Sequence, residues 1–255
     1  MKIAVLVKQV PDTWDPRRLD PSTYRADRTG GEQVVDEIDE RAVEVALAHR
    51  DRVGQTEVVV VTMGPDGARD VLRRMLAMGA DRAVHVLDDA LAGADLVRTA
   101  EALAAVLVAE APDLVVAGNE STDGRGGVLP AMLAEHLGLA LLSGLTSIEV
   151  DGTRVSGTRT NEAGTAHVHA QLPAVVSITE QLPEARVAGL RGIMAAKRKP
   201  VARFTANDLG LAPSGATTRV LTAAPRPPRT AGERLTDDGT AARRLADFLA
   251  DRHLI

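Results

Sequence analysis

The chain has 255 residues, of which 45% are hydrophobic and only 2% aromatic, and its formal net charge is −5. This length suits one large α/β domain, or a domain of about 200 residues with an appendage. The acidic balance excludes nucleic acid as the main partner, because phosphate backbones need a basic face. The absence of cysteine excludes disulfides, iron–sulfur clusters, thiolate nucleophiles and cysteine-ligated zinc, and it agrees with a cytoplasmic location.

Four segments have the pattern of buried strands. The runs at 3–7, 57–62 and 113–118 are apolar on both faces, and a shorter run at 82–87 alternates less cleanly. The first run resembles a signal peptide superficially, but Lys8 ends it, so we predict a core strand. No apolar run approaches the roughly 20 residues that cross a bilayer, and we expect no membrane insertion.

Helical patterns alternate with these strands, at Asp36–Arg50, Asp66–Met78, Ala94–Ala109 and Gly127–Leu137. Strand–helix alternation predicts an α/β fold with a doubly wound, mostly parallel sheet of the Rossmann-like, adenine-nucleotide-binding type. Ligands of such sheets bind beyond the carboxyl ends of the strands.

The pattern changes after Leu145. Residues 147–158 predict a hairpin that turns at Asp151-Gly152, and further strands follow at 165–170 and 174–179. We therefore assign 1–206 to a nucleotide-binding domain with an added hairpin region. Residues 207–255 form an arm that carries Pro213, Pro225, Pro227 and Pro228 and a short amphipathic helix near 241–250. Such an arm is either disordered or wrapped on another protein.

The loop Gly118–Gly127 is the first candidate ligand site. It leaves a strand and enters a helix, its glycines let backbone N–H groups approach an anion, and the helix amino terminus adds positive potential. Ser121 and Thr122 can donate to phosphate oxygens, and Arg125 can neutralise charge. The spacing fits neither the P-loop nor the dinucleotide fingerprint, and an ordinary flexible turn is the alternative.

Two further loops point to the same edge of the sheet. Gly64, after Met63, permits close approach to a base or ribose, although a purely structural role also explains it. Lys8 follows the first strand. Three loops converging on one edge predict a nucleotide site there.

Groups that could carry catalysis are sparse. His167 and His169 share one face of a predicted strand, and a solvated strand face explains them better than a metal site does. The sequence has no Gly-x-Ser-x-Gly elbow and no evident acid–base pair. We therefore predict a binding protein without catalytic residues and without a metal.

The segment 190–200 joins an apolar patch to a basic end. A helix with cations near its carboxyl terminus, stopped by proline, is the plain interpretation. The functional alternative is a partner-docking element, in which adaptable apolar side chains and steering cations contact another protein. The residues concerned are Leu190, Ile193, Met194, Lys197 and Lys199.

These stretches together resemble the electron transfer flavoprotein beta subunit family, nearly from end to end. The two most specific are Ala77–Ala83 (Ala-Met-Gly-Ala-Asp-Arg-Ala) and Ile193–Pro200 (Ile-Met-Ala-Ala-Lys-Arg-Lys-Pro). Supporting stretches are Val7–Asp12, Asp39–Glu44, Gly118–Gly127, Leu172–Val176 and residues 228–232.

The resemblance implies an obligate heterodimer with an alpha subunit that holds most of one FAD, while the beta subunit binds a structural AMP. It also implies electron transfer from acyl-CoA or related flavin dehydrogenases towards a quinone oxidoreductase. Thr13 and Trp14 would approach the flavin, Leu190 would anchor on the dehydrogenase, and the arm would embrace the alpha subunit. The AMP pocket would comprise Leu6, Asp36, Ile38, Asp39, Met63, Gly118, Asn119, Ser121, Thr122, Asp123, Gly124, Arg125, Gly126, Gly127, Val128 and Leu129.

The sequence departs from the family pattern at two places. Asp36-Glu37 stands where Asn-Pro is usual, which puts base contacts there in doubt. Residues 183–187 read Pro-Glu-Ala-Arg-Val instead of Asn-Glu-Pro-Arg-Tyr, which changes the rigidity of the docking loop and indicates a specialised dehydrogenase partner.

Three alternatives stay open at this point. An electron-bifurcating protein would hold a second FAD in place of AMP. A nucleotide-hydrolysing enzyme of the same architecture would need a Ser-Gly-Gly-x-Asp-Ser loop where residues 8–13 stand. A stand-alone nucleotide-binding regulator would have no use for the long arm.

Overall fold

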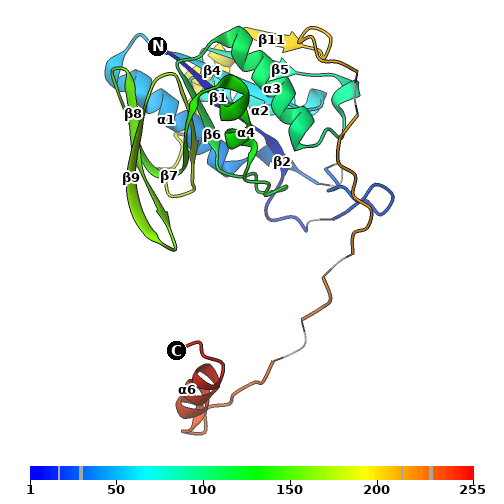
Figure 1. Ribbon diagram of the computed structural model, residues 1–255, viewed down its shortest axis with the longest axis vertical. Coiled ribbons are helices and arrows are strands. Elements are labelled where there is room, and N and C mark those ends of the chain that lie inside the picture. Colours follow the sequence, from blue (N-terminus) through cyan, green and yellow to red (C-terminus); the bar gives the residue numbers. More distant parts are fainter. Residues whose placement is uncertain (17, 29–30, 214, 225, 230–231) are drawn as a thin grey trace. The chain divides into compact units, whose positions relative to one another are not determined.

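A nine-stranded sheet organises the larger of two structural units, Met1–Leu221, in the order β11-β5-β4-β1-β6-β10-β7-β8-β9 (Figure 1). The computed structural model describes residues 1–16, 18–28, 31–213, 215–224, 226–229 and 232–255. The strands from β11 to β7 are parallel, and β8 and β9 extend the sheet as an antiparallel addition. The predicted fold class is confirmed.

The strands of this sheet, in chain order, are β1 Lys2–Leu6, β4 Glu57–Met63, β5 Arg82–Val86, β6 Leu114–Gly118, β7 Ala140–Asp151, β8 Arg154–Asn161, β9 Gly164–Gln171, β10 Ala174–Ile178 and β11 Val201–Phe204. The helices of the unit are α1 Glu37–Val53, α2 Arg69–Met78, α3 Leu96–Glu110, α4 Leu129–Leu137 and α5 Leu190–Ala196, with single 3₁₀ turns η1 Asp66–Ala68 and η2 Asp89–Leu91.

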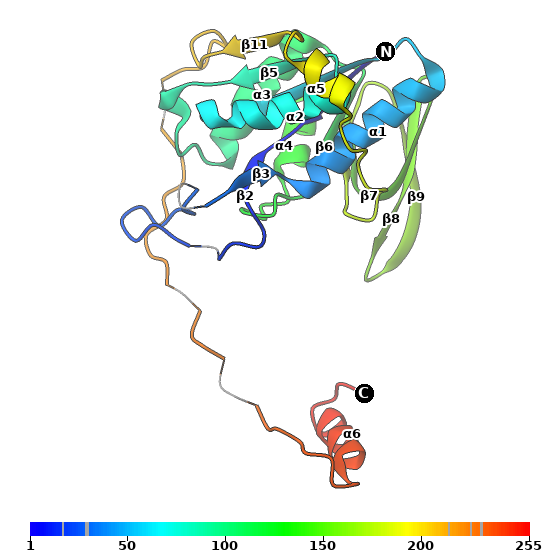
Figure 2. The same cartoon turned by 180° about the vertical axis from the view of Figure 1, so that it is seen from behind.

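Two apolar layers sandwich the central strands. Ile3 and Val5 of β1 face a core that includes Leu47 of α1 and Met75 of α2. Ala4 and the other alternate residues face a second core formed with α3 and α4. Strands buried on both faces explain the continuous apolar runs in the sequence. Figure 1 shows α3 and α4 in front of the sheet, and Figure 2 shows α1 and α2 from the opposite side.

Two short strands had no clear signal in the sequence. β2 (Gln9–Pro11) pairs antiparallel with β3 (Gln33–Val35) as a small separate ribbon. This ribbon continues the chain beyond β1 and returns it to the start of α1. Three-residue strands are too short to show a period, so pairing, not pattern, defines them.

The chain divides after Leu221, whereas the sequence placed the boundary after residue 206. Residues 207–221 belong with the first unit because α3 holds them: Arg98 Nη2 donates to the Ala212 carbonyl, and Asp95 Oδ2 accepts from the Thr217 backbone N–H at 2.6 Å. The second unit, Thr222–Ile255, contains α6 (Ala241–Asp251), whose described residues are all at least partly exposed. Pro225 and residues 230–231 of the predicted arm lie outside the described residues.

Candidate nucleotide-binding site

The three loops that the sequence assigned to a ligand site follow adjacent strands. β4, β1 and β6 are neighbours in the sheet and parallel, so the segments after Met63, Leu6 and Gly118 emerge at one edge. The predicted convergence of these loops is confirmed. Contact with a nucleotide stays a prediction for each residue.

Asp39 in the first turn of α1 joins two of these loops. Its Oδ2 accepts the Lys8 backbone N–H at 2.8 Å, and its Oδ1 accepts the Gly118 N–H at 3.2 Å. A Cβ at Gly118 would lie 2.8 Å from Asp39 Oδ1, so glycine is required for this approach. Burial, with the neighbouring charge of Asp36, raises the pKa of the Asp39 carboxyl well above its usual value. Asp39 therefore connects the ends of β1 and β6 from a buried position.

Asp36 connects the third element, the loop 118–127, to the same helix. Its Oδ1 accepts the Ile38 N–H and caps α1, while its Oδ2 accepts both the backbone N–H and the hydroxyl of Thr122, at 2.7 and 2.9 Å. Asp36 is 1% exposed. The sequence named Asp36, Asp39 and Thr122 as ligand contacts, and the structure shows that their carboxylate and hydroxyl groups also fix the loops to one another.

A charge cluster lies beside the loop. Lys8 Nζ donates to Asp123 Oδ1 at 2.7 Å and to Ser121 Oγ at 3.1 Å, and the Arg28 guanidinium binds Asp123 Oδ2 at 2.9 and 2.7 Å. Burial opposes ionisation of Asp123, but the bonds from Lys8 and Arg28 outweigh it and hold the pKa of this carboxyl below its usual range. The Lys8 and Arg28 side chains stay 40% and 45% exposed, so both cations also face solvent where an anion can reach them.

Arg28 was missed in the sequence. It lies in a stretch without periodicity, 95 positions from Asp123 along the chain. No spacing rule relates two residues so far apart.

The second half of the loop lies at the surface, and the N–H groups of Gly124 and Arg125 donate back into the loop, to Asp123 Oδ1 at 2.6 Å and to the Ser121 carbonyl at 2.9 Å. Gly124–Val128 are exposed, and Arg125 and Gly127 adopt positive φ angles of 46° and 66°. Val128 at the amino terminus of α4 has no side chain that can cap the helix, so the Leu129 N–H in the first turn has no capping partner, while Pro130 has no N–H to satisfy.

Several buried side-chain atoms of the described residues, His49 Nδ1 and Thr62 Oγ1 among them, have no hydrogen-bond partner, and one such atom lies in this loop. The Asn119 side-chain oxygen is buried and has no hydrogen-bond partner among the described residues, although it lies directly after β6 in the ligand loop. Leaving such an acceptor unpaired costs about 1–3 kcal/mol. A donor on a bound molecule, such as the amino group of an adenine, would satisfy it, and the residues present therefore fit a nucleotide.

The loop after β4 has a structural explanation as well. The Gly64 carbonyl accepts from His85 Nε2 at 3.0 Å, and a Cβ on Gly64 would lie 3.1 Å from that of Ala68. Glycine thus allows the 3₁₀ turn η1 to pack against this loop. Leu6 is 7% exposed and belongs, with Met63, to the second core.

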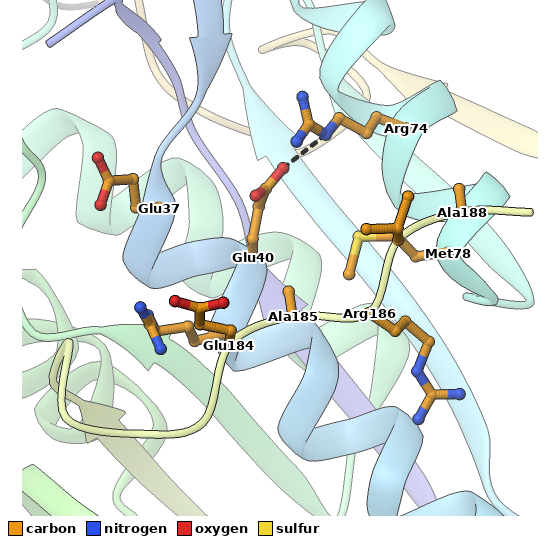
Figure 3. Close-up of a pocket in the computed structure, with 10 residues that line it drawn as sticks. Glu37, Glu40, Arg74, Met78, Glu184, Ala185, Arg186 and Ala188 are labelled. Atoms are coloured by element: carbon orange, nitrogen blue, oxygen red, sulfur yellow. Dashed lines mark ion pairs between the residues drawn. The ribbon is translucent and has the colours of Figure 1, made fainter.

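A pocket of about 400 Å³ opens elsewhere, between α1, α2 and residues 184–188 (Figure 3). Arg74 Nε pairs with Glu40 Oε1 at 2.6 Å in its wall, and Met78 contributes an apolar surface. A smaller hollow of about 120 Å³ borders the ligand loop at Asp123, beside the ribbon residue Pro11. The exposed indole of Trp14 follows that ribbon.

Three of the predicted docking residues lie on α5, against the carboxyl end of α2, and Lys197 and Lys199 follow the helix. Leu190, Ile193 and Met194 are 77%, 47% and 58% exposed. Lys197 is exposed, whereas the Lys199 ammonium donates to three backbone carbonyls.

The imidazole of His167 is hydrogen-bonded to Thr158 across β8 and β9. Within the described ranges no group of three or more His, Asp or Glu side chains is placed to hold a metal ion. Within the same ranges no helix is long and apolar enough to cross a membrane.

A family model and several individual proteins that match this chain all point to the same protein family. The family model described as electron transfer flavoprotein domain matches residues 25–209. The electron transfer flavoprotein subunit beta of Mycobacterium leprae is 43% identical over 99% of both chains, and that of Megasphaera elsdenii is 34% identical over 91% of this chain and 90% of the relative. The caffeyl-CoA reductase-Etf complex subunit CarD of Acetobacterium woodii is 32% identical over the whole of both chains.

Proposed function

The chain belongs to the electron transfer flavoprotein beta subunit family, and from this premise we propose that it works as an electron carrier subunit with a structural AMP at the β4–β1–β6 edge. Its partner is an electron transfer flavoprotein alpha subunit, and together they hold one FAD. The complex accepts electrons from acyl-CoA or related flavin dehydrogenases and delivers them towards a quinone oxidoreductase. The chain itself binds and orients, and supplies no reacting group.

The observation that carries the AMP proposal is the unpaired, buried oxygen of Asn119 in a loop that Asp36 and Asp39 hold rigid. The exposed backbone at 126–128, where the N–H groups have no partner among the described residues, and the uncapped start of α4 would supply donors for a phosphate. Lys8, partly exposed, adds a positive charge at the same edge. A neutral acceptor for the base and a positive environment for the phosphate are the two features that an adenine nucleotide needs.

FAD supplies the redox chemistry when it is bound, and the chain tunes its surroundings. We place the flavin side of the chain near the β2–β3 ribbon, because Trp14 follows it fully exposed, at 93%. The apolar side chains of α5 form the transient contact with the dehydrogenase. Exposed aliphatic and methionine side chains suit a surface that must bind and release its partner.

The test is to co-express the chain with an alpha subunit and to purify the complex without added nucleotide. One flavin per heterodimer by absorption, with AMP released on denaturation, is the expected result. Two flavins per heterodimer and no AMP would favour a bifurcating protein instead. Asn119→Ala should lower AMP content severalfold at unchanged FAD content.

The matched control is Asn207→Ala, which removes an exposed amide outside the proposed pocket. Equal AMP content in both variants and the wild type would contradict the role of Asn119. Reduction of the flavin by several acyl-CoA dehydrogenases then tests the dehydrogenase specialisation that residues 183–187 indicate, and equal rates with all of them would count against it.

A further inference from the structure

The docking segment, defined here as residues 184–199 with α5 at its centre, is anchored at both ends. At its first end the Arg186 guanidinium binds the Glu44 carboxylate through Nε and Nη2 at 2.7 and 2.8 Å, and its Nη1 binds Asp51 at 2.7 Å. The Arg186 backbone N–H donates to the same Glu44 carboxylate at 3.1 Å. Glu44 and Asp51 both belong to α1, and a two-pronged arginine–carboxylate pair fixes direction as well as distance.

At its other end the Lys199 ammonium lies on the carboxyl terminus of α2. It donates to the carbonyl oxygens of Leu76, Gly79 and Ala80 at 2.9, 3.2 and 2.6 Å. An ammonium has three donors, and all three are used here. The carbonyls that end a helix carry partial negative charge and lack partners within the helix, so a cation satisfies both needs.

Between the anchors the backbone of α5 rests directly on α2. A Cβ on Gly192 would lie 2.2 Å from the Ala77 carbonyl oxygen, which only glycine permits, and Ala196 is buried. The opposite side of α5 carries the exposed Leu190 and Met194. A helix of seven residues is far too short to persist alone in water, so its orientation depends on what holds its ends.

We propose that Arg186 and Lys199 are positioning residues, which clamp the docking segment to α1 and α2 so that the apolar side chains of α5 meet the dehydrogenase in a fixed orientation. The inference rests on the proposed function for the identity of the partner, but not for the clamp itself. Lys199, which the sequence grouped with the docking side chains, acts through the fold and not by touching the partner. Figure 3 shows the first clamp residue, Arg186, on the irregular segment that passes α1.

The experiment compares Lys199→Met, Arg186→Gln and the control Arg198→Gln in the purified heterodimer. Arg198 is exposed and its side chain makes no recorded bond within the described residues, so the control removes a neighbouring cation without touching either clamp. Amide hydrogen exchange of residues 187–196 reports local opening without any dehydrogenase. Loss of either clamp should speed this exchange about tenfold or more, since each releases hydrogen bonds to a charged group. The control should match the wild type.

Reduction by a dehydrogenase provides the second readout. Both clamp variants should raise KM for the dehydrogenase severalfold with kcat and the flavin spectrum unchanged, and Lys199→Arg, which keeps a cationic donor, should restore KM in part. Unchanged exchange in the clamp variants would overturn the inference, and so would a raised KM without faster exchange, which would indicate direct contact. If exchange accelerates and no dehydrogenase reduces even the wild type, the clamp stands and the proposed partner is wrong.

Discussion

Gly118 gives the sharpest test of how the ligand edge is built, through the change Gly118→Ala. The new Cβ would lie 2.8 Å from Asp39 Oδ1 and 3.2 Å from Ile38 Cγ2. Asp39 cannot yield easily, because the Lys8 and Gly118 N–H groups hold its carboxylate in place. Overpacking of this kind costs about 1–3 kcal/mol, and displacement of a buried hydrogen bond adds about 1–2 kcal/mol.

We therefore expect Gly118→Ala to lower the free energy of unfolding by about 2–5 kcal/mol, which for a domain of this size lowers Tm by about 4–20 °C. Urea unfolding of the full chain, followed by far-ultraviolet circular dichroism, measures the loss. Gly189→Ala is the matched control, since its Cβ would meet nothing within 4 Å. If the clash with Asp39 is the cause, adding Gly118→Ala to Asp39→Ala should cost far less than it does alone. A loss below about 0.5 kcal/mol for Gly118→Ala in the wild-type background would refute the reasoning.

Three other changes test separate contacts. Asp36→Ala should lower the free energy of unfolding by about 2–3 kcal/mol and lower the nucleotide content, because it removes the cap of α1 and both bonds to Thr122. Thermal unfolding and nucleotide extraction measure the two effects, and wild-type stability together with wild-type nucleotide content would contradict the prediction. The pKa of Asp123 is depressed by two cations, so its stabilisation is complete above the unfolded value near 4 and is lost as pH falls through the lower folded pKa. Asp123→Asn should thus be destabilising at pH 7, and the difference from wild type should shrink in acid, as pH-dependent urea unfolding will show; a difference independent of pH would argue against the ion pairs. Gly157→Ala places a Cβ 2.2 Å from the Ser147 carbonyl between β8 and β7, and should cost about 2 kcal/mol or more by the same assay; an unaffected variant would mean that the hairpin shifts freely.

The sequence predicted the core strands β1, β4, β5 and β6 and the helices α1 to α4 because each of these carries its own local signal, whereas the short strands β2, β3 and β11 were not predicted. The runs that became β1, β4 and β6 are apolar on both faces, and glycines end α2 and α4 as expected. The edge where the loops meet follows from strand direction alone. The stretches shared with the family also extended over nearly the whole chain, so the family identification needed no structure.

The roles of individual side chains were less accessible. The resemblance placed Asp36 and Asp39 in the AMP pocket, and nothing local in the sequence indicates that their carboxyl groups bind Thr122 and Gly118. The sequence grouped Lys199 with the docking cations, but its ammonium binds backbone carbonyls at the carboxyl end of α2. Such contacts join residues that are far apart in the chain, and periodicity reports only which face a side chain occupies, not what it meets there.

Helix α1 contacts both the proposed nucleotide site and the proposed docking segment. Its amino-terminal end holds the loops of the proposed site through Asp36 and Asp39, and its later turns hold the docking segment through Glu44 and Asp51, about 8 and 18 Å further along the axis than Asp39. We therefore expect a substitution in this helix to affect both the retention of the proposed nucleotide and the choice of partner. In a library of random variants selected for either property, we expect these four acidic positions to tolerate the fewest replacements. We expect lineages that change partners to substitute the exposed apolar residues of α5 and to keep α1 unchanged.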